Sequence, residues 1–180
     1  MKHALLFVAA LAAASLSTSA FAGEGSGGFL SAEVGNTNLS IPGFGDDNDT
    51  AYGVRGGYFF NANWGVEGFY TQLGDESVGG VNVDMDSYGV GLVGKKNMDG
   101  PHSGFFIGGR VGVARTSVDI SIDGLGSASD SSNRVYIGAS AGYDFNKNLG
   151  LSLNVNHHRP QVFDETLRVT TTTLALEYRF

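Results

Sequence analysis

Residues 135–155 read VYIGASAGYDFNKNLGLSLNV and contain the pattern that decides the fold. On both sides of the polar segment Asn146-Lys147-Asn148, every second residue is apolar, and the residues between are small or polar. A period of two predicts β-strands with one apolar face, and a short polar break between two such runs predicts a hairpin. The stretch therefore predicts two adjacent antiparallel strands, over 133–145 and 149–158.

The same alternation continues through most of the chain and predicts eight strands. The predicted strands cover residues 27–36, 50–60, 64–73, 86–96, 104–118, 133–145, 149–158 and 168–180. Short connections at 61–63, 97–103 and 146–148 alternate with long polar connections at 37–49, 74–85, 119–132 and 159–167. An even strand number with short turns at one end and long loops at the other is typical of an outer-membrane barrel.

Two architectures share this alternation: a soluble β-sandwich with apolar faces inward, and a membrane barrel with apolar faces outward. Aromatic residues favour the barrel because they gather at the strand ends near the short turns, as in the interfacial girdles of membrane barrels. The predicted girdle consists of Tyr58, Phe60, Trp64, Phe105, Tyr143 and Phe145. The predicted fold is all-β, an eight-stranded antiparallel up-and-down transmembrane β-barrel.

Composition removes several classes of protein. The 180 residues include 28 Gly, 3 Pro and no Cys, with 11 Lys and Arg against 18 Asp and Glu. Without Cys there is no disulfide framework or thiol nucleophile, and a net charge of −7 argues against nucleic-acid binding. The excess of Gly is too irregular for collagen and indicates positions that need small side chains.

The first 22 residues predict a signal peptide. Lys2 precedes an apolar run, ALLFVAALAAA at 4–14, which is too short to span a membrane as a helix. Ala20 and Ala22 form a small-x-small cleavage site before Gly23. We therefore expect a cleaved signal peptide at 1–22 and a single barrel domain at 23–180.

The last strand, TLALEYRF at 173–180, resembles the C-terminal assembly signal of OmpA/OmpX-type small outer-membrane barrels. Residues 53–67, GVRGGYFFNANWGVE, and residues 143–155, YDFNKNLGLSLNV, resemble hairpins of the same family. The resemblance implies a bacterial outer-membrane location with extracellular loops and periplasmic termini. In the assembly signal it implies roles for Leu174, Leu176, Tyr178 and Phe180. The chain stops at Phe180, so we expect no peptidoglycan-binding domain.

The inward faces of the predicted strands carry charged residues of both signs. By strand parity these residues are Glu33, Arg55, Glu67, Arg110, Asp144, Glu177 and Arg179. The interior of an eight-stranded barrel is only wide enough for side chains to fill, so these charges must pair. Across the 61–63 turn, Arg55 is expected opposite Phe69 and diagonal to Glu67, within reach of an ion pair. The network is either a gated ion path or a polar plug.

The long connections are predicted to be acidic loops. Their acids are Asp46, Asp47, Asp49, Asp75, Glu76, Asp84, Asp86, Asp119, Asp123, Asp130, Asp164 and Glu165. Acidic runs usually stay hydrated, and these lack the spacing of a calcium loop, so no metal site is expected. Divalent ions could still link them to phosphate-rich lipid.

The pair His157-His158 raises the question of catalysis, since some small barrels are lipid A deacylases or palmitoyltransferases that use His with Ser. Arg159 and Pro160 follow, with no Ser in the deacylase position. We therefore expect no catalytic residues and no cofactor.

The expected function is a non-enzymatic structural role in the envelope with surface-exposed acidic loops. A low-conductance channel gated by lumenal salt bridges and a surface adhesin remain alternatives. The expected partners are outer-membrane lipid including lipopolysaccharide, and the barrel-assembly machinery and periplasmic chaperones during biogenesis. The protein itself is expected to be a monomer.

Overall fold

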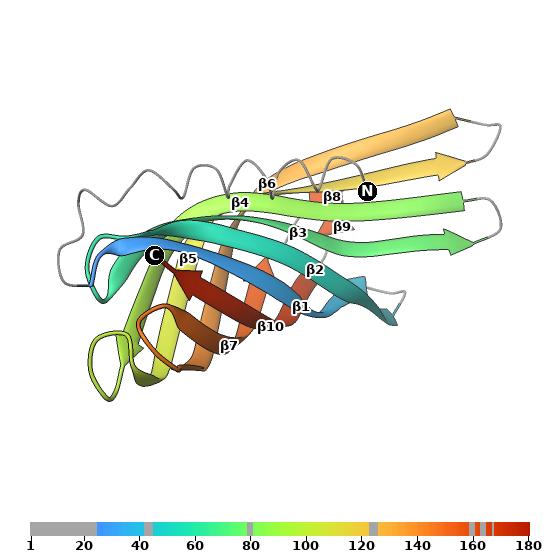
Figure 1. Ribbon diagram of the computed structural model, residues 1–180. Coiled ribbons are helices and arrows are strands. Elements are labelled where there is room, and N and C mark those ends of the chain that lie inside the picture. The colour runs from blue at the N-terminus through green and yellow to red at the C-terminus, as the bar shows by residue number, and fades with distance from the viewer. Residues whose placement is uncertain are drawn as a thin grey trace.

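The chain forms a closed antiparallel barrel in a computed structural model that describes residues 25–41, 45–78, 81–122, 126–158, 161–162, 165–166 and 168–180 (Figure 1). The barrel strands are β1 (Gly27–Ile41), β2 (Gly45–Phe59), β3 (Trp64–Val78), β4 (Val81–Asn97), β5 (Gly104–Ile122), β6 (Gly126–Asp144), β7 (Leu149–His158) and β10 (Arg168–Arg179). Between β7 and β10, β8 (Gln161–Val162) and β9 (Glu165–Thr166) form a separate two-stranded sheet. Consecutive barrel strands pair, and β10 closes the ring against β1. The predicted eight-stranded barrel is confirmed.

The two ends of the barrel differ. Three short connections, 60–63, 98–103 and 145–148, lie at the end that also holds the first residue of β1 and the last residue of the chain. We call this the turn end and the opposite one the hairpin end. The predicted cleavage residues Ala20, Ala22 and Gly23 lie outside the described residues.

At the hairpin end the strands run further than the sequence predicts. β1 and β2 pair up to Ile41 and Gly45, and the β3–β4 and β5–β6 hairpins project well beyond the barrel (Figure 1). The interpretation of 37–49, 74–85 and 119–132 as loops is therefore wrong. On β4 and β5 the alternation continues into this end, and Val81, Val83 and Met85 pair with Ile122, Ile120 and Val118. On β2 and β6 it stops, because residues 45–50 and 126–132 contain no large apolar residue.

Because the strands are longer than predicted, most acids that the sequence analysis assigned to loops belong to strands. Most of them lie on strands, Glu165 lies in β9, and Asp123 and Asp164 fall outside the described residues. Those on strands are Asp46, Asp47, Asp49, Asp75, Glu76, Asp84, Asp86, Asp119 and Asp130. The acidic character of this end thus belongs to paired strands.

The barrel is apolar outside and mainly polar inside, the reverse of a soluble domain. One buried apolar cluster, formed by Phe29, Phe59 and Val93, also lies inside. Large apolar side chains such as Val90, Ile137 and Leu176 are more than half exposed, whereas Glu67, Arg55 and Asp144 are buried. Within the described residues, no helix is long and apolar enough to cross a membrane. An exposed apolar surface of this extent requires a non-aqueous environment.

Two of the short turns use the same sequence, Asn-x-Asn. Asn61 Oδ1 accepts hydrogen bonds from the backbone N–H groups of Asn63 and Trp64 at 2.8 and 3.0 Å. Asn63 Nδ2 then donates to the carbonyl oxygen of Lys95 at 2.8 Å. Such side-chain bonds to nearby backbone stabilise tight turns. This pattern fastens the turn to the next strand.

The second turn repeats the arrangement. Asn146 Oδ1 accepts from Asn148 N and Leu149 N, each at 2.9 Å, and Asn148 Nδ2 donates to Arg179 O at 2.8 Å. The two strand residues held in this way, Lys95 and Arg179, both direct their side chains into the lumen. The turns therefore also position two lumenal cations.

Candidate functional site

The lumenal charges form two clusters, and the first lies midway along the barrel. Arg55 on β2 donates from Nε to Glu33 Oε1 on β1 at 2.9 Å and from Nη1 to Glu67 Oε1 on β3 at 2.7 Å. The Tyr136 hydroxyl on β6 donates to the same Glu67 oxygen at 2.7 Å. The Arg55 guanidinium also lies over the Phe69 ring, 4.9 Å from its centroid. Arg55 is therefore the centre of this cluster.

Arg110 is held less completely than Arg55. Its Nε lies 3.9 Å from Glu67 Oε1, and its Nη2 donates to Asn154 Oδ1 at 3.2 Å. Within the part of the chain that the structure describes, Nε and Nη1 of Arg110 and Oε2 of Glu67 have no hydrogen-bond partner. Buried charged groups that lack partners are costly, so this side of the cluster is the one most easily rearranged.

The second cluster lies near the turn end. Lys95 Nζ contacts Asp144 Oδ1 at 3.0 Å and Glu177 Oε1 at 3.2 Å. Arg179 pairs with the same Asp144 oxygen through Nη2, and its Nε lies 3.0 Å from Glu177 Oε1. Asn97 Nδ2 adds a bond to Asp144 Oδ2 at 2.7 Å. Two bases and two acids thus neutralise each other here.

His102, in the turn between β4 and β5, covers this second cluster. Its Nδ1 lies 3.0 Å from Nη1 of Arg179, and its Nε2 lies 3.3 Å from the carbonyl oxygen of Gly25. A neutral ring can satisfy both contacts, accepting from Arg179 at Nδ1 and donating to Gly25 at Nε2. Partial burial, together with the positive charge of Arg179, lowers the pKa of His102 below its usual value.

All seven charged residues named from strand parity lie inside the barrel, and the structure divides them between the two clusters. Glu33, Arg55, Glu67 and Arg110 belong to the first, and Asp144, Glu177 and Arg179 belong to the second. The observed register places Arg55 opposite Phe69, as the sequence predicts.

Sequence reasoning missed Lys95 and Tyr136, which are both central. Tyr88, Val90 and Leu92 face outward, so the alternation on this strand places the side chain of Lys95 inside. Val135 faces outward, so the next residue, Tyr136, must face inward. The parity signal was therefore available for both residues.

Lumenal glycines make room for these large side chains. A Cβ atom at Gly138 would lie 2.7 Å from Arg110 Cγ, and one at Gly91 would lie 2.4 Å from the Tyr136 hydroxyl. Both distances are shorter than side chains tolerate. The excess of glycine in the sequence thus has a steric cause within the lumen.

A hollow of about 180 Å³ opens at the turn end beside Phe59, His102 and Arg179, and the space above the first cluster is smaller. A hollow above the first cluster, lined by Arg55, Tyr136, Asn156 and His158 among others, has a volume of about 20 Å³. That is room for about one water molecule. Much larger hollows, of about 650 and 1020 Å³, are lined mainly by outward-facing residues.

The two histidines of β7 lie on opposite faces. His158 is buried in the lumen, and His157 Nδ1 lies 3.0 Å from Thr170 Oγ1 of β10. In the described ranges, no group of three or more His, Asp or Glu side chains is placed to hold a metal ion.

The predicted aromatic girdle and the predicted assembly signal lie on the outer face. Tyr143 packs edge-on against Phe105 and Phe145, with centroids 4.9 and 5.5 Å apart, and Tyr178 stacks with Phe180. The exposed members of the girdle are Phe60, Trp64, Phe105, Tyr143 and Phe145, whereas Tyr58 is half-buried. Leu174, Leu176 and Tyr178 are exposed along one face of β10, and Phe180, which directly follows β10, is exposed as well.

A closed eight-stranded barrel with an apolar outside and a charge-paired inside defines the class of small outer-membrane barrels. The chain belongs to the outer membrane protein beta-barrel domain family, whose model matches residues 7–180. It is therefore an integral protein of the bacterial outer membrane.

Solved structures with the same fold include several small barrels. The attachment invasion locus protein Ail of Yersinia pestis is 22% identical, with a TM-score of 0.65 over 88% of this chain and 100% of Ail. Neisserial surface protein A is 17% identical, with a TM-score of 0.69 over 87% of this chain and 100% of that one. OprG of Pseudomonas aeruginosa is 17% identical, with a TM-score of 0.58 over 88% of this chain and 98% of OprG. The comparison with curated proteins finds no significant match.

Proposed function

We propose that this protein is a non-enzymatic structural barrel of the outer membrane whose lumen does not conduct ions. The observation that carries this proposal is the filled interior, where both charge clusters are internally neutral and the hollow beside Arg55 measures about 20 Å³. An ion crossing the barrel would have to separate several buried ion pairs. Separating buried pairs is costly, so the clusters act as a plug.

The proposed orientation places the turn end in the periplasm and the hairpin end outside the cell. It is supported by the general arrangement of outer-membrane barrels, which have short periplasmic turns and longer extracellular segments. The proposed partners are outer-membrane lipid, including lipopolysaccharide, and the assembly machinery and chaperones that deliver the chain. The barrel is proposed to work as a monomer.

Planar-bilayer recording of the purified, refolded protein tests the plug. We expect no single-channel currents from the wild type. Arg110→Ala removes the member of the first cluster with the fewest hydrogen bonds. We expect ion leakage through the lumen from this variant first. Arg168→Ala, at an exposed position at the start of β10, is the matched control and should stay silent. Currents from the wild type would instead support a low-conductance channel gated by these salt bridges.

A second candidate is a surface-interaction role for the projecting hairpins. Its support is that β5 and β6 remain paired to Ile122 and Gly126 and that this hairpin projects well beyond the barrel (Figure 1). The similarly folded Ail is described as an attachment invasion protein. Replacing residues 118–130 by an Asn-Gly turn should leave the barrel intact, because Ser117 and Ser131 are paired. Loss of attachment to host cells by this variant would support the role, and unchanged attachment would contradict it.

A further inference from the structure

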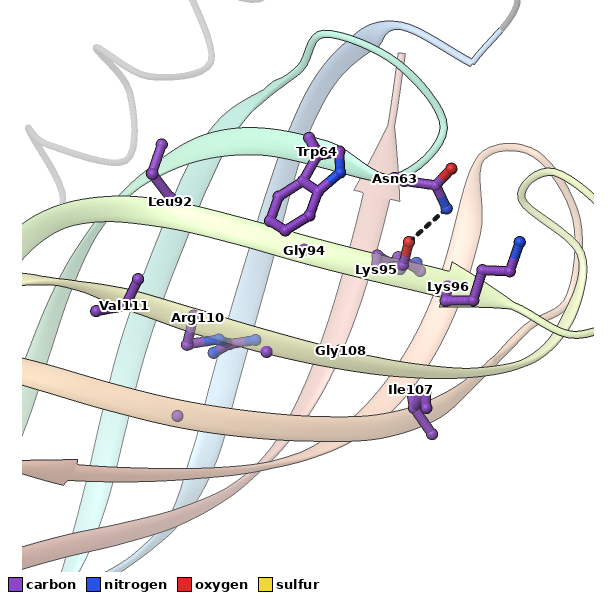
Figure 2. A pocket seen from close by; sticks show the side chains of 12 residues that line it. Asn63, Trp64, Leu92, Gly94, Lys95, Lys96, Ile107, Gly108, Arg110 and Val111 are labelled. Carbon is purple, nitrogen blue, oxygen red and sulfur yellow. Dashed lines mark hydrogen bonds between the residues drawn. The ribbon is translucent and has the colours of Figure 1, made fainter.

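A groove crosses the outer face of the barrel near the turn end. Its volume is about 650 Å³, and its floor lies over the paired glycines Gly94 and Gly109 on β4 and β5. The side chains of Trp64, Leu92 and Ile107 stand around it on the near face of the sheet (Figure 2). The neighbouring Arg110 side chain passes behind the strands into the lumen, so the groove is separate from the charge network.

Strand register explains the shape of the groove. Trp64, Gly94 and Gly109 form one row across β3, β4 and β5, with a large residue followed by two residues without side chains. A Cβ atom at Gly94 would lie 3.1 Å from the Trp64 ring, so the indole covers this glycine. A Cβ atom at Gly109 would meet only a backbone oxygen, at 3.9 Å. The depression is therefore open at Gly109.

The groove is amphiphilic along its length. Leu92 pairs with Val111 on the side towards the middle of the barrel, and Lys96 pairs with Ile107 on the side towards the turn end. Lys96 is exposed, and among the described residues it has no ion pair. Asn63, which is bonded to the Lys95 carbonyl oxygen, holds the polar end rigid (Figure 2). An apolar trough thus ends at one free cation.

We propose that this groove binds an anionic phospholipid, with an acyl chain along Gly94 and Gly109 and the phosphate at Lys96. Trp64, at the same level, suits the boundary between headgroups and acyl chains. A basic residue at that level attracts anionic headgroups, and a pocket of this volume lies in the range of small-molecule sites. The proposal depends on the outer-membrane location and not on whether the lumen conducts.

A second hollow on the outer face differs from the groove in the charges that line it, and this difference explains why the anionic lipid is assigned to the groove. That hollow, of about 1020 Å³, is lined by Gly56 and Gly68 and carries Asp86 as well as Arg115 towards the hairpin end. A carboxylate beside the cation disfavours an anionic headgroup. Only Lys96 supplies charge on the outer surface of the first groove. The match between one cation and one phosphate is therefore specific to the groove beside Trp64.

Trp64 provides the measurement, because it is the only tryptophan of the chain. The wild type is reconstituted into vesicles of phosphatidylcholine that contain increasing fractions of phosphatidylglycerol brominated on its acyl chains, and quenching of the Trp64 fluorescence is recorded. Brominated phosphatidylcholine at the same fractions serves as the reference lipid. We expect phosphatidylglycerol to quench at lower fractions by about fivefold, the preference that one basic residue near a headgroup provides.

Two matched pairs of variants assign the effect. Lys96→Gln should abolish the preference for phosphatidylglycerol, whereas Lys147→Gln, an exposed lysine of the β6–β7 turn, should keep it. Gly109→Leu fills the groove and should reduce quenching by both lipids. Ala32→Leu adds the same side chain on the outer face of β1 and should leave quenching unchanged.

Three results would overturn the proposal. One is equal quenching by the two lipids in the wild type, which would mean an ordinary lipid boundary. Another is equal loss of preference in Lys96→Gln and Lys147→Gln, which would mean a diffuse effect of charge. The third is quenching that weakens as protein is added at constant lipid composition, which would mean that a second copy of the chain occupies the groove.

Discussion

At the scale of single residues, Arg55 does the most to hold the lumen together. It bridges Glu33 and Glu67 and packs on Phe69, so its guanidinium links β1, β2 and β3. Removing it would leave two buried carboxylates without their main counter-charge. An uncompensated buried charge destabilises a fold far more than the loss of a surface charge.

Arg55→Ala should lower the free energy of unfolding by about 3–5 kcal/mol, the usual cost of breaking a buried ion pair. Arg168→Ala, at an exposed site, should change it by about 0–1 kcal/mol. Urea unfolding of the refolded proteins in the same lipid or detergent gives both values. Equal midpoints for the two variants would show that the lumenal pair contributes no more than a surface charge.

At the scale of elements, the turn between β4 and β5 closes the turn end through His102. Its contacts to Arg179 and Gly25 suit the neutral ring, and protonation at Nδ1 would turn the acceptor towards Arg179 into a donor. The pKa of His102 is lowered in the folded barrel, so the folded protein binds a proton at this ring only at a lower pH than the unfolded chain does. This stabilisation is therefore complete above the usual His pKa of about 6.5 and decreases as the pH falls.

The stability of the wild type should thus fall between about pH 7 and pH 5 by more than that of His102→Asn. Asn is the suitable replacement because His102 has a positive φ of 55°, which Asn tolerates. Urea midpoints across this range measure the difference. An NMR titration of the His102 ring with a midpoint above 6.5 would contradict the prediction.

At the scale of the whole molecule, closure of the ring depends on the terminal residue. Phe180 N donates to Gly28 O at 3.0 Å, and Gly28 N donates to Phe180 O at 3.1 Å. The Phe180 ring covers Gly28 so closely that a Cβ there would lie 2.5 Å from it. The residue proposed to act in the assembly signal therefore also completes the seam between β1 and β10.

Deleting Phe180 should reduce the amount of folded barrel in the outer membrane while leaving export across the inner membrane intact. The variant loses two backbone hydrogen bonds at the seam as well as the terminal aromatic of the assembly signal. Folded barrels migrate differently on gels before and after boiling, and this shift measures the folded fraction in the membrane. Phe180→Tyr keeps the backbone and the ring and is the control. Wild-type levels of the deletion variant would refute the role of this residue.

Strand parity was enough to identify most of the lumenal charges. The alternation around Arg55 and Asp144 assigned both to the inside, and the short turn at 61–63 gave the register that places Arg55 opposite Phe69. The extensions of β2 and β6 could not be found in this way, because residues 45–50 and 126–132 contain no large apolar residue. On β4 and β5 the alternation was available, since Val81, Val83 and Met85 alternate with polar residues and pair with Ile122, Ile120 and Val118.

The sequence by itself determined the number of barrel strands, the apolar outer face and the inward direction of residues such as Glu67. These follow from local geometry, because successive side chains of a strand point to opposite faces. Only the tertiary structure decided that Lys95 of β4 meets Asp144 of β6 and Glu177 of β10. Contacts across the lumen depend on the diameter and stagger of the closed barrel, which no single strand encodes.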